Sequence, residues 1–171
     1  ATKISADALS ISFFKSFGLP ITILRPFNNY GPRQSNRAII PTIISQFFND
    51  NEYIEVGNTN TIRDFTYVTD TANAYYLALK NNNYGEIFNV SSGFEISIEN
   101  LISKISKIIN ISKKIKKSKK RVRPSKSEVT RLLGDSNKFK DLTGWSPSIS
   151  LTEGLVKTTE WIKKSEINLK N

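Results

Sequence analysis

The chain of 171 residues contains no cysteine, no histidine and no methionine. Without cysteine it forms no disulfide and no thiolate metal site. Without histidine it lacks the usual nitrogen ligand of zinc and the base of a histidine-dependent catalytic triad. We therefore expect no metal site, and the lack of cysteine fits a reducing compartment, so we expect a cytoplasmic protein.

Long apolar runs are also missing. No stretch approaches the roughly 20 apolar residues that cross a bilayer, and the first residues do not combine a basic stretch with an apolar core as a secretory signal does. The sequence predicts no membrane partner and no signal peptide. Its first residues are Ala1, Thr2 and Lys3 rather than a methionine, and we expect a fragment of a longer protein.

Positive charge is abundant, with 25 lysines and arginines against 15 acidic residues and a formal net charge of +10. Solvated lysines, a nucleic-acid partner or an anionic small ligand would each fit this charge. The densest run, K-K-I-K-K-S-K-K-R at residues 113–121, has no interleaved aromatic residue on which bases could stack. It predicts an exposed connection. A nucleic-acid-binding module is the weaker hypothesis, and we expect no nucleic-acid partner.

Hydrophobic periodicity predicts an α/β fold. Residues 5–17 form an expected helix that Gly18 ends, and residues 21–24 follow as a β-branched strand typical of parallel sheets. The clearest helix is 98–109, whose isoleucines and leucine repeat every three or four positions. Further expected helices cover 38–49, 70–80, 135–142 and 151–164, and further strands cover 53–56, 63–67 and 87–90. We expect a loop at 27–37 and a short buried segment at 132–133.

A polar segment, R-P-F-N-N-Y-G-P-R-Q at residues 25–34, directly follows the first strand. The carboxyl end of a parallel strand is where α/β folds bind ligands, and this segment offers amide and guanidinium donors. A structural loop whose polar residues satisfy turns is the alternative.

The same segment resembles the post-strand motif of extended short-chain dehydrogenases/reductases that act on nucleotide sugars. Three more segments match this family in order: G-N-T-N-T-I-R-D-F-T-Y-V-T-D at residues 57–70, F-N-V-S-S-G at 88–93, and R-P at 123–124 followed by G-W-S-P at 144–147. Thr59 and Ser91 stand where the family has glycines. The matches cover almost the whole chain.

The resemblance implies the C-terminal part of a Rossmann-like parallel sheet with a small α/β substrate-binding subdomain. Residues 1–30 would be a remnant of the NAD-binding domain, and residues 31–171 mainly the substrate-binding part. Lys3 matches the lysine of the family's Y-x-x-x-K signature, which holds the nicotinamide ribose and lowers the tyrosine's pKa. The cofactor implied is NAD, but no G-x-G-x-x-G turn occurs in this chain. The NAD-binding half would lie outside it.

The resemblance also implies a nucleotide-diphosphate sugar as the substrate. Arg63 and Arg123 match the two arginines that bind its pyrophosphate, Asn28 matches an amide that contacts the diphosphate, and Asn89 matches a further contact. Residues 37–41 match a stretch whose backbone meets the base. For each arginine a salt bridge to a neighbour such as Asp64 is the alternative.

A carboxylate pair at Asp64 and Asp70 could suggest acid–base chemistry. We instead expect Asp64 to orient strands and Asp70 to cap the helix that follows it.

The resemblance is strongest to 4,6-dehydratases, including the nonulosonic (legionaminic) acid type that uses N-acetylglucosamine nucleotides. These lyases oxidise C4 of the sugar, eliminate water across C5 and C6, and return the hydride to C6. A 4-epimerase, which returns the hydride to C4, is the alternative within the family. A non-catalytic binding relative is a third. The full-length enzyme is expected to be a homodimer, and this fragment alone is expected to be inactive.

Overall fold

A computed structural model describes residues 1–118, 121, 124 and 127–170. Its elements, in chain order, are α1 (Thr2–Phe17), β1 (Ile23–Pro26), β2 (Asn28–Tyr30), α2 (Ile39–Phe48), β3 (Tyr53–Val56), β4 (Ile62–Tyr67), α3 (Val68–Lys80), β5 (Ile87–Val90), β6 (Glu95–Ser97), α4 (Ile98–Ile109), β7 (Lys114–Lys117), β8 (Arg131–Leu132), α5 (Asn137–Thr143) and α6 (Leu151–Lys170). The α/β class expected from the sequence is confirmed.

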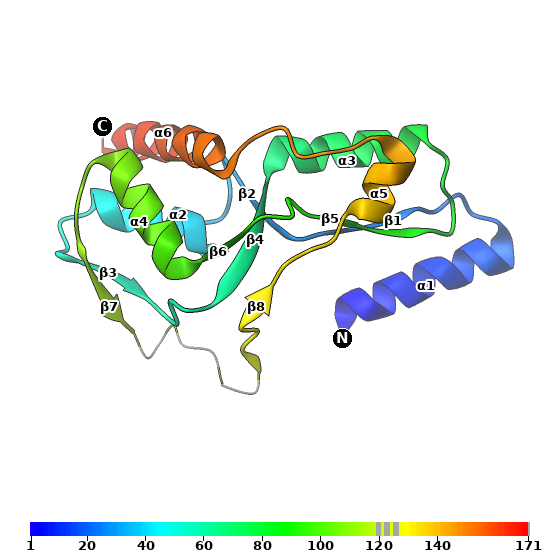
Figure 1. Ribbon diagram of the computed structural model, residues 1–171, viewed down its shortest axis with the longest axis horizontal. Helices are drawn as coiled ribbons and strands as arrows, with labels where there is room; N and C mark the ends of the chain where they lie inside the picture. Colours follow the sequence, from blue (N-terminus) through cyan, green and yellow to red (C-terminus); the bar gives the residue numbers. More distant parts are fainter. Residues whose placement is uncertain (119–120, 122–123, 125–126, 171) are drawn as a thin grey trace.

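One end of the elongated molecule is built on the parallel pair β1–β5 (Figure 1). Helices α3 and α5 lie beside this pair, and the rings of Phe88, Phe139 and Trp145 pack in its core. Within the described residues β1 pairs only with β5. The Rossmann-like part is therefore a short parallel pair, and within the described residues the outer edge of β1 is unpaired.

The other end holds the larger core, which α2, α4 and α6 form with β4 (Figure 1). Helix α4 has the bounds expected from its periodicity, and it buries Ile98, Leu101, Ile102 and Ile105 against that core. Ser97 caps it, since its Oγ accepts a hydrogen bond from the Asn100 amide at 3.1 Å. An amphipathic stripe of this strength identifies a helix from the sequence alone, and the packing of its apolar face stabilises the helix.

Strand β4 connects the two ends. It pairs with β2 in parallel, with β6 antiparallel and with β8 in parallel. Because β2 and β4 run side by side, the segment after β1 and the R-D segment of β4 lie next to each other. This pairing builds the candidate site.

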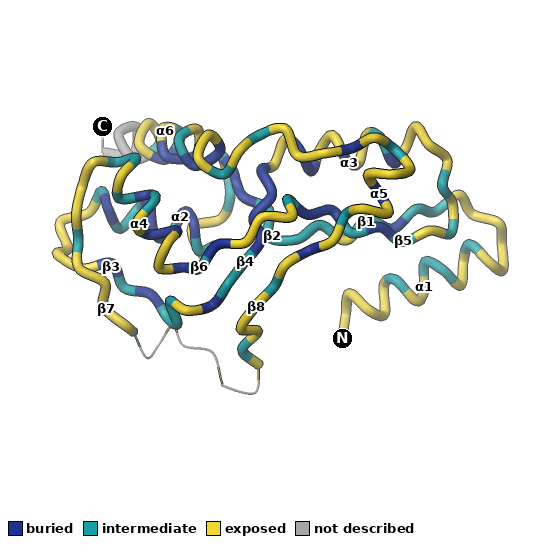
Figure 2. Tube along the Cα trace, in the orientation of Figure 1, coloured by how far each residue is buried: buried dark blue, intermediate teal, exposed yellow. Residues whose placement is uncertain are grey.

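Helix α1 packs loosely. It has no buried residue, and its C-cap Gly18 adopts a left-handed conformation at φ 66°, which ends the helix where the sequence predicts. Ile4 and Phe17 are 74% and 71% exposed, and Figure 2 shows the helix exposed along most of its length. An ion pair from Asp7 to Arg25 at 2.7 Å ties it to β1.

Three local expectations are wrong. Residues 28–30 lie in the predicted loop but form strand β2, and residues 114–117 of the basic run form strand β7, paired with β3. Both strands depend on partners that are distant in sequence. All of β7 is exposed, as expected for the run. The segment at 132–133 is not buried, since Leu133 is 38% exposed.

No helix of the described residues is both long enough and apolar enough to span a bilayer.

Candidate functional site

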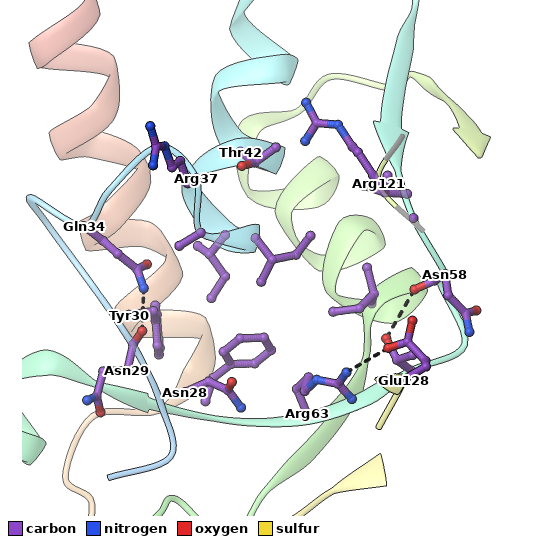
Figure 3. A pocket seen from close by; sticks show the side chains of 18 residues that line it. Asn28, Asn29, Tyr30, Gln34, Arg37, Thr42, Asn58, Arg63, Arg121 and Glu128 are labelled. Atoms are coloured by element: carbon purple, nitrogen blue, oxygen red, sulfur yellow. Dashed lines mark hydrogen bonds and ion pairs between the residues drawn. The ribbon is translucent and has the colours of Figure 1, made fainter. Parts of the chain in front are cut away.

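A cavity of about 460 Å³ lies between β2 and β4 on one side and α2 and the end of β3 on the other (Figure 3). Its walls combine arginines and amides with apolar side chains. The lining residues are Asn28, Asn29, Tyr30, Gln34, Arg37, Ala38, Ile39, Ile40, Thr42, Val56, Gly57, Asn58, Thr61, Arg63, Phe65, Ile98, Arg121 and Glu128. The described lining holds three arginines against one glutamate, so the cavity favours an anionic ligand.

Arg63 lies on the wall that β4 forms, with a side chain only 13% exposed. Its Nη1 donates to the Ile62 carbonyl at 2.7 Å, and its Nη2 lies 3.5 Å from Glu128 Oε1. Glu128 is thus one ion-pair partner of Arg63, whereas the sequence suggested Asp64. At 3.5 Å the ion pair is long, so Arg63 could release Glu128 and bind an anionic ligand in its place.

Asn28 reaches the same cavity from β2. Its Nδ2 donates to the backbone carbonyl of Asp64 at 2.9 Å, which fixes the amide against β4. The structure thus brings together Asn28 and Arg63, two of the predicted diphosphate ligands, on neighbouring strands (Figure 3).

Asn89 lines a second cavity of about 370 Å³. This cavity adjoins the first at Asn28, which lines both. Its other lining residues come from the end of β1, from Phe27 and from Leu132. A ligand that extends beyond the first cavity past Asn28 would therefore reach Asn89.

Two predicted site residues do not join this group. Lys3 lies in the first turn of α1, is exposed and does not line the cavities described here. Arg123 lies outside the described residues, so its predicted role stays a prediction.

The stretch at 37–41 does reach the cavity, since Arg37, Ala38, Ile39 and Ile40 line it. Sequence reasoning missed Arg121 and Glu128. Arg121 ends the basic run that was interpreted as an exposed connection. Glu128 lies in the R-P-S-K-S-E segment, and its position five residues after a predicted phosphate ligand was the only available signal.

Asp64 has a structural role next to the site. Its carboxylate is fully buried and accepts hydrogen bonds from the Ser92 amide and hydroxyl at 2.9 and 2.6 Å, from the Gly93 amide at 3.0 Å and from the Gly134 amide at 3.3 Å. It therefore fixes two loops against β4, which extends the strand-orienting role predicted for it.

Asp70 has a similar structural role, and its predicted function as a helix cap is wrong. It lies inside α3, whose N-cap is Tyr67. Its carboxylate accepts hydrogen bonds from the Ser148 amide and hydroxyl at 3.1 and 2.6 Å and from the Ile149 amide at 3.1 Å. The buried Asp70 thus anchors the chain just before α6.

Tyr30 forms part of the cavity wall and is buried. Burial is the main cause that raises the pKa of its hydroxyl above the ordinary value, with smaller contributions from Tyr67, Asp70 and Glu153. The hydroxyl donates to the Leu151 carbonyl at 3.3 Å. A phenol that stays protonated in this way supports packing and does not act as a base.

Comparison with known proteins agrees with this geometry. The family model described as GDP-mannose 4,6 dehydratase matches residues 1–158. The chain is 29% identical to the human dTDP-D-glucose 4,6-dehydratase over 174 residues, which cover 100% of the chain and 49% of that protein. It is 33% identical to the UDP-glucuronate 4-epimerase of Thermodesulfobacterium geofontis, over 96% of the chain and 50% of that protein.

Solved structures show the same fold. The UDP-glucuronic acid 4-epimerase of Bacillus cereus, in complex with UDP-glucuronic acid and NAD, superposes with a TM-score of 0.87 at 32% identity, over 96% of this chain and 52% of that one. The RMD protein of Pseudomonas aeruginosa, complexed with NADPH, gives a TM-score of 0.88 at 27% identity, over 95% and 55%.

The chain spans about half the length of the curated relatives it matches. The family match nevertheless covers most of the chain and includes both strands that carry Asn28 and Arg63. The chain belongs to the GDP-mannose 4,6 dehydratase family, within the extended short-chain dehydrogenases/reductases that modify nucleotide sugars.

Proposed function

We propose that this chain is the substrate-binding part of an NAD-dependent nucleotide-sugar 4,6-dehydratase. The observation that carries the proposal is the pairing of β2 with β4, which sets Asn28 beside Arg63 in a cavity whose described charges are mainly positive. A nucleotide-diphosphate sugar carries two negative charges at its pyrophosphate, and a guanidinium binds such oxygens through parallel N–H donors. The family and its dehydratase relatives support the reaction.

In this proposal the diphosphate lies against Arg63 and Asn28, and the base occupies the first cavity near residues 37–40. The sugar passes Asn28 into the second cavity and meets Asn89. Glu128 would exchange its contact with Arg63 for the phosphate. Arg123 would add a second guanidinium to the diphosphate, as the resemblance implies.

The residues present fit NAD only in part. Lys3 is exposed at the start of α1 and would hold the nicotinamide ribose. The chain has no glycine-rich dinucleotide turn, which relatives of this kind use for the pyrophosphate. We propose that residues 1–30 complete an NAD-binding domain whose larger part lies outside this chain. NAD, when bound there, supplies the hydride acceptor.

A 4-epimerase is the second candidate, because epimerases are as similar to the chain as dehydratases are. The identity to the T. geofontis UDP-glucuronate 4-epimerase is 33%, against 29% for the human dehydratase. The two reactions share the oxidation at C4. They differ in whether water leaves across C5 and C6, so the product distinguishes them.

Replacing Arg63 with alanine in the full-length enzyme is expected to weaken nucleotide-sugar binding about ten- to a hundredfold. A charge-assisted hydrogen bond contributes roughly 1.5–3 kcal/mol. Lys116→Ala is the control, because Lys116 is 58% exposed and pairs with Glu55 away from the cavity. Binding is measured by isothermal titration calorimetry. Equal losses in both variants would contradict the site.

The homodimer and the cytoplasmic location stay predictions. The mass of the full-length enzyme in solution, measured by light scattering, tests the dimer, and fractionation of the producing cells tests the location.

A further inference from the structure

Strand β7 forms an outer edge of the molecule, at the end opposite α1 (Figure 2). All of its residues are exposed, and within the described part of the chain it pairs only with β3. None of its residues lines the two cavities described above. The proposed function therefore does not use this strand.

The backbone of β7 is paired on one side. The amides of Lys114 and Ser118 both donate to carbonyls at the two ends of the β3 segment, at 3.3 and 2.8 Å. Successive amides of a strand point alternately to its two sides. The amides of Ile115 and Lys117 therefore point away from β3, to an edge that no described strand occupies. An edge of this kind can pair with a strand from another chain.

The two faces of β7 differ in chemical character. Lys114 and Lys116 lie on the face that carries Glu55, because β3 and β7 pair in register, and Lys116 Nζ lies 3.1 Å from the Glu55 carboxylate. Ile115 lies on the opposite face, in register with a buried residue of β3. Ile115 itself is 42% exposed, so the apolar face of this sheet continues past the core to the open edge. Lys117 shares that face.

The lysines also restrict which strand can pair with this edge. Two copies of β7 placed side by side would bring like charges together, and such pairs are destabilising. Repulsion therefore disfavours a second copy of this chain as the partner. Among the described residues Lys114 and Lys117 have no ion-pair partner. Their charges favour a strand with acidic side chains.

We propose that the open edge of β7 binds an extended protein segment in which acidic and apolar residues alternate. The segment adds a strand whose backbone bonds to the outward amides of Ile115 and Lys117. Its acidic side chains lie beside Lys114 and Lys116, and its apolar side chains lie beside Ile115. This inference goes beyond the proposed function and does not depend on it.

The test titrates a fluorescently labelled synthetic peptide of alternating glutamate and valine with the full chain, and follows binding by fluorescence anisotropy. A peptide of the same composition, with its glutamates and valines in two separate blocks, keeps the charge and loses the alternation. The double variant Lys114→Gln and Lys116→Gln removes charge beside the edge. Its matched control is Lys163→Gln with Lys164→Gln, which removes the same charge from an exposed part of α6. Ile115→Pro removes an outward amide and keeps the lysines.

The alternating peptide is expected to bind the unmodified chain about tenfold more tightly than the block peptide. Ile115→Pro and the double variant at Lys114 and Lys116 are each expected to weaken its binding about three- to tenfold, and the α6 control by less than about twofold. Equal binding of the two peptides, equally tight binding of duplex DNA, or no binding of the alternating peptide would overturn the proposal. Each of these results would leave the nucleotide-sugar site untouched.

Hydrogen exchange in the unmodified chain keeps the proposal testable if Ile115→Pro does not fold. Saturating alternating peptide is expected to slow exchange of the outward amides of Ile115 and Lys117 by about tenfold. The amide of Lys116 points to β3, and its exchange is expected to change by less than about twofold. Equal slowing at all three amides, or no slowing at Ile115 and Lys117, would show that the peptide does not add a strand to this edge.

Discussion

At the residue scale, the contact between Gly154 and Tyr30 shows how closely helix α6 packs against the wall of the main cavity. Gly154 lies in α6, and a Cβ added there would collide with the Tyr30 hydroxyl and approach Tyr67 Cδ2 at 2.8 Å. Tyr30 is 2% exposed, and its hydroxyl is held by a hydrogen bond to the Leu151 carbonyl. The absence of a side chain at residue 154 therefore allows α6 to approach the strand that carries Asn28.

Gly154→Ala is expected to lower the free energy of unfolding by up to about 2 kcal/mol. Alanine gains about 1 kcal/mol in helix propensity, but overpacking costs about 1–3 kcal/mol. Adding Tyr30→Phe removes the nearest clashing atom, so the double variant should lose less stability than the sum of the two single variants. Urea denaturation of all four proteins measures this coupling. Strictly additive changes would show that the two residues do not press on each other.

The sequence predicted the site residues only where a single continuous segment contained a recognisable motif. Asn28 and Arg63 stand in recognisable motifs, and the structure places them side by side. Glu128 contacts Arg63 from 65 positions along the chain. No local pattern predicts such a contact, because the fold alone brings the two segments together.

At the element scale, amphipathic helices were predictable and short strands were not. Helix α4 has its expected bounds because its own side chains define the buried face. Strands β2 and β7 exist because β4 and β3 pair with them. Their sequences, N-N-Y and K-I-K-K, show neither β-branched runs nor apolar alternation. The formation of β2 and β7 therefore depends on pairing with strands that are distant in sequence.

The attachment of α3 to the segment before α6 depends on Asp70, whose partners lie 78 and 79 positions away. Asp70→Asn is expected to lower the free energy of unfolding by about 2 kcal/mol. The asparagine keeps one acceptor oxygen but directs an NH₂ group at backbone amides that already donate. Hydrogen exchange at Ser148 and Ile149 should accelerate with it.

The control for this variant is Asp141→Asn, which removes the same charge from an exposed site on α5. Its stability is expected to change by less than about 0.5 kcal/mol. Similar stability losses in the two variants would mean that Asp70 acts only through net charge. Both are measured by chemical denaturation.

At the scale of the whole molecule, the proposed substrate cavity lies within this chain, whereas little of the machinery for hydride transfer does. The Rossmann-like part described here is the pair β1–β5, with α1 exposing apolar side chains beside it. The spacing Y-x-x-x-K does occur at Tyr76 and Lys80, but this pair lies exposed on α3 and does not line the described cavities. We therefore expect this chain to bind a nucleotide without carrying out the reaction at the sugar.

The chain by itself is expected to form no 4-keto product when it is incubated with NAD and a panel of nucleotide sugars. It has no glycine-rich turn to hold the cofactor's pyrophosphate, and no tyrosine is among the described residues that line the cavity containing Asn89. The loss of a positioned acid or base typically costs about 10²–10⁴-fold in rate, and without bound cofactor there is no hydride acceptor. Weak nucleotide binding should persist, because Asn28 and Arg63 already converge within the described part of the chain. The measurement pairs a carbonyl-specific product assay with nucleotide titration of the same sample. Turnover at a rate ordinary for enzymes would show that this chain holds NAD and a proton donor of its own, and the assignment of Lys3 to a larger cofactor site would then be wrong.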